Sequence, residues 1–335
     1  MEREIAVEFL EMLEVGKKQS HQGLTVFPLT AQKPSLYEYL TLDEALHGGF
    51  ITIQEKGQGT VSEIEVVNRG EKDVLLIDGE ELVGAKQNRI LNISLIVAAM
   101  ATASIPVSCV ESGRWAPSFS GFKSEDRMAF SNLRLKKTVS VMKSAVAGQG
   151  FRSDQSEVWD GIKERECAMN VCSPTAAMSH IHKTKKADID KLRKDFKVGE
   201  GDVGAVFAVN GKILGADIFD KPAVYQKLFP KVLESYLMEV LAAKKSKETI
   251  GDEEAVAFLA EAKGNLGQIL VSPGIGNIVR INAKGVVGAA LVVKGSVVHT
   301  SIFRLEKEVL EDNNPGSPLS RPSLRRQRLQ GDIIM

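Results

Sequence analysis

Three two-residue turns restrict the folds that this chain can adopt. They are Asp78-Gly79, Asn210-Gly211 and Lys294-Gly295, and each lies between two apolar runs. Asp-Gly and Asn-Gly supply the positive φ angles that a type I′ turn requires, so the first two predict tight β-hairpins, whereas Lys-Gly is a weaker signal for the same structure. Because a hairpin joins antiparallel strands, the sequence predicts a mainly antiparallel sheet built from hairpins.

Helical patterns between the predicted strands make the expected fold class α+β, with several helices packed on the sheet. Thr41 and Glu44 have the spacing of a capping box at the start of a short helix. Residues 125–148 carry apolar side chains at helical spacing, and residues 251–264 form another helical run that ends at a glycine.

A further helix is expected to begin after residue 219. Asp220 suits its N-cap position, and Pro222 suits its first turn, where the missing N–H is not needed. Pro230 lies inside the same run, where its ring clashes with the preceding turn. We therefore expect the helix to kink or split there.

The chain divides into three regions. Residues 1–20 mix glutamates with apolar residues and predict an amphipathic helix, since a signal peptide has a basic start and an uninterrupted apolar run. Residues 21–305 form the predicted α+β domain, either as one unit or as subdomains 21–150 and 195–305 joined by a helical connection. Residues 306–335 are rich in Pro, Ser, Asn and Arg and predict a mobile basic tail.

The balance of positive and negative charges bears on which kinds of partner the protein can have. The chain has 43 Lys and Arg residues against 43 Asp and Glu residues, so its net charge favours neither nucleic acid nor an anionic membrane. Its longest apolar runs are far shorter than the roughly 20 residues that a membrane span needs. We expect no membrane anchoring, and nucleic acid is not favoured as a partner.

The cysteines indicate a reducing compartment. Cys109, Cys167 and Cys172 are odd in number and lack a closely spaced ligand pattern, so the sequence predicts neither a disulfide framework nor a zinc site. A cytoplasmic location fits this pattern. His180 and His182 have alternate spacing and do not share a helix face, so no metal site is expected.

The densest polar segment of the chain follows the first predicted turn. It carries two acids, Glu80 and Glu81, and then Lys86, Asn88 and Arg89, between two apolar strands. A solvated polar crossover explains such a segment, because loops are generally polar. The mixture of acids, an amide and an arginine also suits the binding of a phosphate or a ribose, with Glu80 as a catalytic candidate and the others as ligand-binding candidates.

A second polar segment ends the strand that carries Cys109. Glu111 follows the thiol on the same strand face and is the better candidate for an acid or a base, since no neighbouring histidine activates Cys109. Arg114 and Trp115 are ligand-binding candidates. The simpler interpretation of Glu111 and Arg114 is a surface ion pair with Trp115 packed beside it, and that of Cys109 is a buried, inert thiol.

Two more titratable residues lie in apolar strands. Asp217 precedes the helix predicted after residue 219 and has no capping duty, which makes it a catalytic candidate. His299 alternates with apolar neighbours, and a half-buried histidine with satisfied hydrogen bonds explains it better than a general base. The chain has no Walker loop, dinucleotide-binding glycine motif, HExxH or G-x-S-x-G sequence.

Four segments resemble the ARG and rhodanese-phosphatase-superfamily-associated protein domain family, in which ARG stands for ADP-ribosylglycohydrolase. They are YLTLDEAL, DGEELVGAKQNRILN, PVSCVESGRW and VNGKILGADIFDKPAVYQKLFPKVLESY. The resemblance extends from about Phe27 to Phe303. It implies a setting among enzymes that handle NAD-derived or ADP-ribosylated molecules, and it carries over no catalytic residues.

Three hypotheses follow. The first is an enzyme or binding protein for an ADP-ribose-like nucleotide, which requires residues 86–89 and 109–115 to fold back into one site. The second is a non-catalytic scaffold or partner of a neighbouring enzyme. The third, RNA binding through the basic segment 321–329, is the least favoured, because that segment has no interleaved aromatic residues. The sequence leaves cofactors undetermined.

Overall fold

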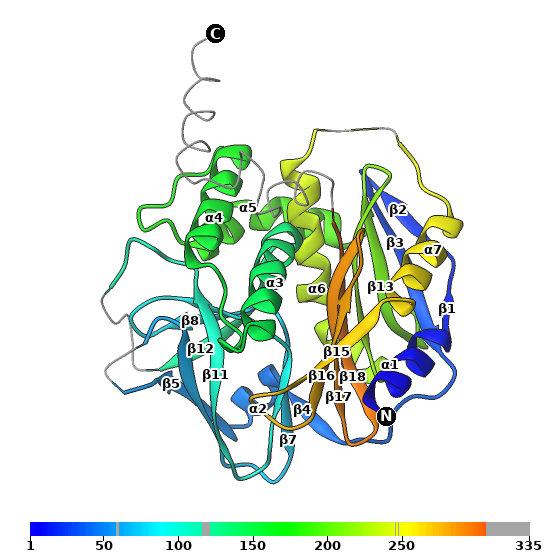
Figure 1. The fold of residues 1–335 in the computed structure, drawn as a ribbon. Helices are drawn as coiled ribbons and strands as arrows, with labels where there is room; N and C mark the ends of the chain where they lie inside the picture. Colours follow the sequence, from blue (N-terminus) through cyan, green and yellow to red (C-terminus); the bar gives the residue numbers. More distant parts are fainter. Residues whose placement is uncertain (58–59, 116–120, 245, 247, 306–335) are drawn as a thin grey trace.

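The computed structural model describes residues 1–57, 60–115, 121–244, 246 and 248–305. Its largest element is a nine-stranded antiparallel sheet in the order β1-β3-β13-β14-β18-β17-β16-β15, with β2 paired to β3 (Figure 1). The strands are β1 (Leu13–Val15), β2 (Gln19–His21), β3 (Leu24–Ala31), β13 (Asp202–Val209), β14 (Lys212–Phe219), β15 (Leu266–Val271), β16 (Asn277–Asn282), β17 (Val286–Val293) and β18 (Ser296–Arg304).

Two smaller sheets lie beside the large one. A six-stranded antiparallel sheet has the order β12-β8-β9-β11-β6-β5, and a three-stranded sheet has the order β10-β7-β4, in which β4 and β7 are parallel. The strands are β4 (Tyr39–Thr41), β5 (Ile51–Glu55), β6 (Glu63–Asn68), β7 (Asp73–Leu76), β8 (Glu80–Gly84), β9 (Arg89–Leu91), β10 (Leu95–Val97), β11 (Thr102–Cys109) and β12 (Phe122–Met128).

Helices cover both faces of the large sheet. The described residues form α1 (Glu2–Glu11), α2 (Leu42–His47), α3 (Ser131–Val146), α4 (Gln155–Met169), α5 (Met178–Arg193), α6 (Pro222–Ala242) and α7 (Asp252–Lys263). Helices α3 and α6 contact one face, and α1 and α7 contact the other (Figure 1). In the described ranges, no helix is long and apolar enough to cross a membrane.

Each face of the large sheet has its own apolar core. Val206 packs with α1 and α7, whereas its neighbour Phe207 packs on the other side, where its ring stacks on Tyr236 of α6 at 4.0 Å. All eight residues of β13 are buried, as expected for a strand covered on both faces. The α+β fold is therefore confirmed, with the large sheet between two helical layers.

Two of the three predicted hairpins are confirmed. Asn210 and Gly211 have φ angles of 49° and 76°, and Lys294 and Gly295 have 50° and 78°, so both turns have the positive φ pair of type I′. They join β13 to β14 and β17 to β18.

The hairpin predicted at residues 78–79 is wrong. Strand β7 belongs to the three-stranded sheet and β8 to the six-stranded sheet, so the turn passes the chain from one sheet to the other. The turn has a positive φ at Gly79, and the Glu80 N–H donates to the Ile77 carbonyl at 3.2 Å. The side chain of Asp78 binds Arg134 and Lys137 of α3. The Asp-Gly pair therefore predicted the turn correctly, but the prediction that its flanking strands pair with each other was wrong.

Two helix boundaries differ from the sequence-based expectation. Helix α1 ends at Glu11, and the rest of the predicted segment 1–20 enters β1 and β2 of the large sheet. In the predicted helix 125–148, the first residues belong to β12, and α3 begins at Ser131. The capping box between Thr41 and Glu44 and the helix predicted at 251–264 are confirmed.

The start and the course of α6 also differ. Pro222 occupies the first turn as predicted, but Lys221 is the N-cap residue, and the Asp220 carboxylate instead accepts a hydrogen bond from the Tyr39 hydroxyl. Burial raises the pKa of Asp220 to about 6. Helix α6 continues through Pro230 to Ala242, so it is not split.

The two predicted subdomains share the large sheet. Strand β3, from predicted subdomain 21–150, pairs with β13 from predicted subdomain 195–305. The nine-stranded sheet thus contains strands of both segments. The tail predicted at residues 306–335 lies outside the described residues.

The capping box of α2 provides a stability test. We expect Thr41→Ala to lower the free energy of unfolding by about 1 kcal/mol, because the side chain that accepts from the Glu44 N–H is lost. Thr41→Ser keeps the hydroxyl and is expected to lose much less. Urea denaturation of the three proteins measures the difference, and equal losses in both variants would show that the methyl group, not the cap, stabilises this helix.

Candidate functional site

The two polar segments predicted to meet do meet. The Glu111 Oε2 accepts from the Asn88 backbone N–H at 3.3 Å and from Arg114 Nη2 at 2.6 Å, and its Oε1 accepts from the Thr175 hydroxyl at 2.9 Å. Burial opposes ionisation of Glu111, but the hydrogen bonds from Arg114 and Thr175 outweigh it and lower its pKa. The pair is not a surface pair, because Glu111 is buried and Arg114 is partly buried.

Arg114 ties the two segments together. It donates to the Ala85 carbonyl at 2.7 Å and to the Asn88 Oδ1 at 3.0 Å, in addition to its bond with Glu111. These contacts orient its guanidinium into the protein. The ion pair therefore fixes the relative position of the loop between β8 and β9 and the chain that follows β11.

Arg89 faces the protein interior. It is 0% exposed, donates to the Gln87 Oε1 at 3.2 Å, and lies 3.7 Å from Glu55 Oε1. The Cys109 thiol also donates to the Gln87 Oε1, at 3.0 Å, and burial raises the pKa of this thiol. A ligand can reach Arg89 only if this packing opens, and the interpretation of Cys109 as a buried, inert thiol agrees with the structure.

Lys86 and Trp115 form the accessible rim of this region. The indole of Trp115 is 54% exposed, and the Lys86 ammonium lies 5.6 Å from the ring centroid. Both residues flank the segments that Arg114 holds together. A large exposed aromatic ring next to a cation is suited to contact a planar anionic molecule.

Glu80 and Glu81 do not belong to this region, and each of them has its own ionic partner. Glu80 accepts from the Lys231 ammonium at 2.9 Å, and Glu81 accepts from the Arg127 guanidinium at 3.1 Å. Burial raises the pKa of both carboxyl groups. Their ionic partners are intramolecular, which is the arrangement expected of residues that stabilise the fold.

Asp217 belongs to a separate buried cluster between the sheets. Its carboxylate accepts from Arg134 Nη2 at 2.6 Å and Nη1 at 2.9 Å, and from the Tyr236 hydroxyl at 3.0 Å. Arg134 also donates through Nε to Asp78 at 3.2 Å, and Lys137 donates to the other oxygen of Asp78. We call Asp78, Arg134, Lys137 and Asp217, together with His299, the buried ionic cluster.

The fold explains how these residues converge. Asp217 on β14 pairs in register with Ser301 on β18, two residues after His299, so the carboxylate and the imidazole project from neighbouring strands. Helix α3 crosses this face of the sheet and brings Arg134 and Lys137 one turn apart. The turn at residues 78–79 then delivers Asp78 from the opposite side.

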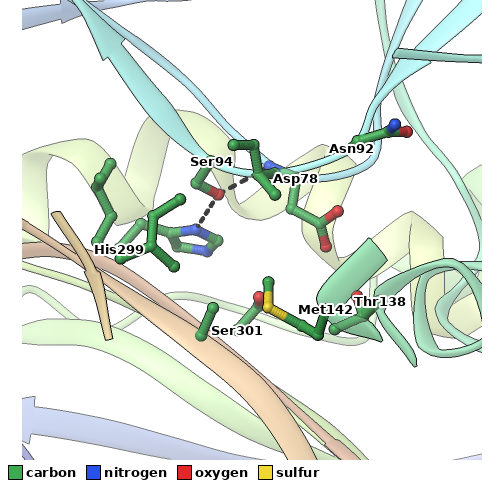
Figure 2. Close-up of a pocket in the computed structure, with 11 residues that line it drawn as sticks. Asp78, Asn92, Ser94, Thr138, Met142, His299 and Ser301 are labelled. Carbon is green, nitrogen blue, oxygen red and sulfur yellow. Dashed lines mark hydrogen bonds between the residues drawn. The ribbon is translucent and has the colours of Figure 1, made fainter. Parts of the chain in front are cut away.

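A small cavity adjoins the buried ionic cluster. Figure 2 shows the side chains of its wall, and its volume is about 20 Å³. Since a water molecule needs roughly 10–15 Å³ by this measure, the cavity has room for about one water or a very small group. Its wall includes Asp78, Ser94, Thr138, Met142, His299 and Ser301.

Charge pairing controls protonation in this cluster. Desolvation opposes the ionised form of Asp217, but the Arg134 charge and the His299 contact outweigh it and hold the pKa of Asp217 far below its usual range. Burial lowers the pKa of Lys137, although the pairing with Asp78 opposes that shift. Asp217 therefore remains an anion at neutral pH.

The sequence indicated Asp217 and His299, but not Arg134, Lys137 or Ser94. Arg134 and Lys137 lie in a helix rich in apolar positions, where charged residues are expected on the solvated face. Ser94 follows a polar segment and carries no recognisable motif. In the part of the chain that the structure describes, no three His, Cys, Asp or Glu side chains are close enough to hold a metal ion.

The fold is that of an α+β protein. Its two polar regions are the one around Glu111 and Arg114 and the buried ionic cluster. The sequence profile of the ARG and Rhodanese-Phosphatase-superfamily-associated Protein domain matches residues 12–303, and the chain belongs to this family. The match begins earlier than the resemblance at Phe27, so it includes β1 and β2. Comparisons with curated proteins and with solved structures give no significant match.

The buried ionic cluster predicts a large effect of a single substitution. Arg134→Met is expected to lower the free energy of unfolding by about 3–5 kcal/mol, because Asp217 and Asp78 would lose a buried counter-charge. Arg134→Lys keeps the charge and is expected to lose less. Denaturant unfolding followed by circular dichroism measures both, and a loss of less than about 1 kcal/mol in Arg134→Met would contradict this role.

The lowered pKa of Asp217 predicts that the stability of the folded protein depends on pH. The lowered pKa in the folded state means that the unfolded chain binds a proton first as the pH falls, so this stabilisation is present above about pH 4 and is lost in acid. We expect Asp217→Asn to lose less stability than the wild type between pH 5 and pH 2.5, measured by urea denaturation across that range. Parallel pH profiles would contradict the assignment.

Proposed function

We propose that this protein binds an NAD-derived or ADP-ribose-like nucleotide at the surface formed by Lys86 and Trp115. The observation that supports the proposal is the 54% exposed indole of Trp115 with the Lys86 ammonium 5.6 Å from its ring centroid. An exposed aromatic ring offers a stacking face for a base, and an adjacent ammonium suits a phosphate. The expected class of ligand comes from the family resemblance.

The roles of the other predicted residues change accordingly. Arg114, Asn88 and Glu111 are positioning residues in this proposal, because their hydrogen bonds hold the two segments together. Arg89 supports the same frame from inside the protein. Glu80, Glu81 and Asp217 lie in other ion pairs and do not contact this ligand.

The second candidate function is that of a non-catalytic partner of a neighbouring enzyme. The observation in its favour is that Glu80, Glu81 and Asp217 have buried intramolecular counter-charges, as in a structural framework. An exposed tryptophan also suits a protein interface, where this residue is frequent among the energetically dominant contacts. The description of the family as associated with other protein families is consistent with this function.

The two tryptophans of the chain allow a direct test. In Trp159→Phe, Trp115 is the single remaining tryptophan, so we expect its fluorescence to change on titration with ADP-ribose or NAD. A base stacked on an aromatic side chain contributes roughly 1–3 kcal/mol, so Trp115→Ala should weaken binding in calorimetry by roughly 5- to 150-fold. Trp159→Phe should keep the wild-type affinity.

The outcomes separate the two functions. Absence of binding to NAD, ADP-ribose, AMP and ribose 5-phosphate would refute the nucleotide proposal. Co-elution with a purified ADP-ribosylglycohydrolase, lost in Trp115→Ala, would then support the partner function. Nucleotide binding that is equal in wild type and Trp115→Ala would place the ligand elsewhere and refute this site.

A further inference from the structure

Ser94 and His299 line the cavity, and Asp217 lies behind them. The Ser94 Oγ lies 2.7 Å from the His299 Nδ1. The His299 Nε2 lies 3.3 Å from the Asp217 Oδ1, within ion-pair distance but without the geometry of a hydrogen bond. The backbone N–H of Asp78 donates to the same serine oxygen at 2.8 Å (Figure 2). This N–H occupies one lone pair of Oγ, and when Nδ1 carries no proton the serine hydroxyl donates to it.

The charge of Asp217 favours one tautomer of His299. Asp217 is an anion, so it stabilises the neutral imidazole that carries its proton on Nε2, the nitrogen 3.3 Å from the carboxylate. Nδ1 is then free to accept the Ser94 proton. The His299 ring also stacks on Phe219, with 4.6 Å between ring centroids, which restrains its rotation.

The exposure of these three side chains decreases from the serine to the histidine and the carboxylate, which is the order that nucleophilic catalysis requires. His299 is 1% exposed and Asp217 is 0% exposed, whereas Ser94 is only partly buried. Ser94 therefore lies closer to the surface than the histidine and the carboxylate behind it. A serine, a histidine base and a carboxylate that orients the base are recognised as a catalytic unit by geometry, whatever their order in the sequence.

We propose that Ser94 is a nucleophile, activated by His299 as general base and positioned by Asp217, in a site that hydrolyses short-chain carboxylic esters. Ser94 Oγ attacks the carbonyl carbon while its proton moves to His299 Nδ1. The alcohol leaves with that proton, and the acyl group remains on Ser94. Water then attacks the acyl-enzyme, gives a proton to Nδ1, and the carboxylic acid leaves as Ser94 recovers the proton.

The cavity sets the class of the acyl group. A volume of about 20 Å³ has room for about one water-sized group, so the methyl of an acetyl group fits and a long acyl chain does not. Apolar side chains, Ile278, Leu291 and Met142, close the wall around this space. The alcohol portion must then lie outside the cavity, on the exposed side of Ser94. This site is separate from the Trp115 surface and does not depend on nucleotide binding there.

Covalent labelling of the full-length chain tests the proposal. We expect a fluorophosphonate probe to modify Ser94 in the wild type, identified by peptide mass spectrometry, and we expect Ser94→Ala to abolish both labelling and the hydrolysis of 4-nitrophenyl acetate. Ser296→Ala is the matched control, because this serine lies on β18, is also partly buried, and bonds only Ser35 among the described contacts of its hydroxyl. It should retain wild-type rates.

His299→Gln separates a catalytic role from a structural one. With folding verified by circular dichroism, its ester hydrolysis should fall at least a hundredfold and lose the rise with pH expected of an imidazole base. Hydrolysis of 4-nitrophenyl octanoate by the wild type should be much slower than that of the acetate. An unlabelled wild type, equal labelling in Ser94→Ala, or equal rates for acetate and octanoate would each overturn the proposal.

Discussion

The ion pair between Arg134 and Asp217 is the interaction on which the rest of this structure depends. Both side chains are 0% exposed, and a charge buried this deeply is tolerated only when a counter-charge and hydrogen bonds replace water. The pair fixes α3 against β14. Through Asp78, the same arginine also holds the turn that passes from β7 to β8. One guanidinium thus connects the large sheet to both smaller sheets.

The position of the cavity follows from this connection. Side chains in an apolar core interdigitate to high density, but hydrogen bonds fix the directions of charged side chains and limit how closely their neighbours can pack. The space beside Asp78, Ser94 and His299 lies where two sheets and α3 converge around such groups. A small void with a few polar groups in a mainly apolar wall is therefore consistent with joining the sheets through ions.

Local sequence signals predicted local structure well. The turns at 210–211 and 294–295, the capping box of α2 and the first turn of α6 all depend on a few adjacent residues, and the structure contains them. The turn at 78–79 has the same local signal, yet the strands on either side pair with other strands. Its side-chain contact with Arg134, more than fifty residues later, and the choice of strand partners are properties of the whole fold, which no short pattern reveals.

Local sequence patterns also failed to predict the burial of the polar residues in the predicted site. Polar residues near a turn were expected in solvent or at a ligand, and Arg89 and Glu111 are buried instead. Both oxygens of Glu111 have partners, because Thr175 donates to one and Arg114 to the other.

A carboxylate that already accepts three hydrogen bonds has little capacity left for a substrate. At the other polar region, Ser94 and His299 are aligned beside free volume. A reactive group needs both an aligned proton acceptor and space for a substrate, and these are long-range properties. His299 and Ser94 are 205 residues apart in the chain, so only the folded structure shows that they meet.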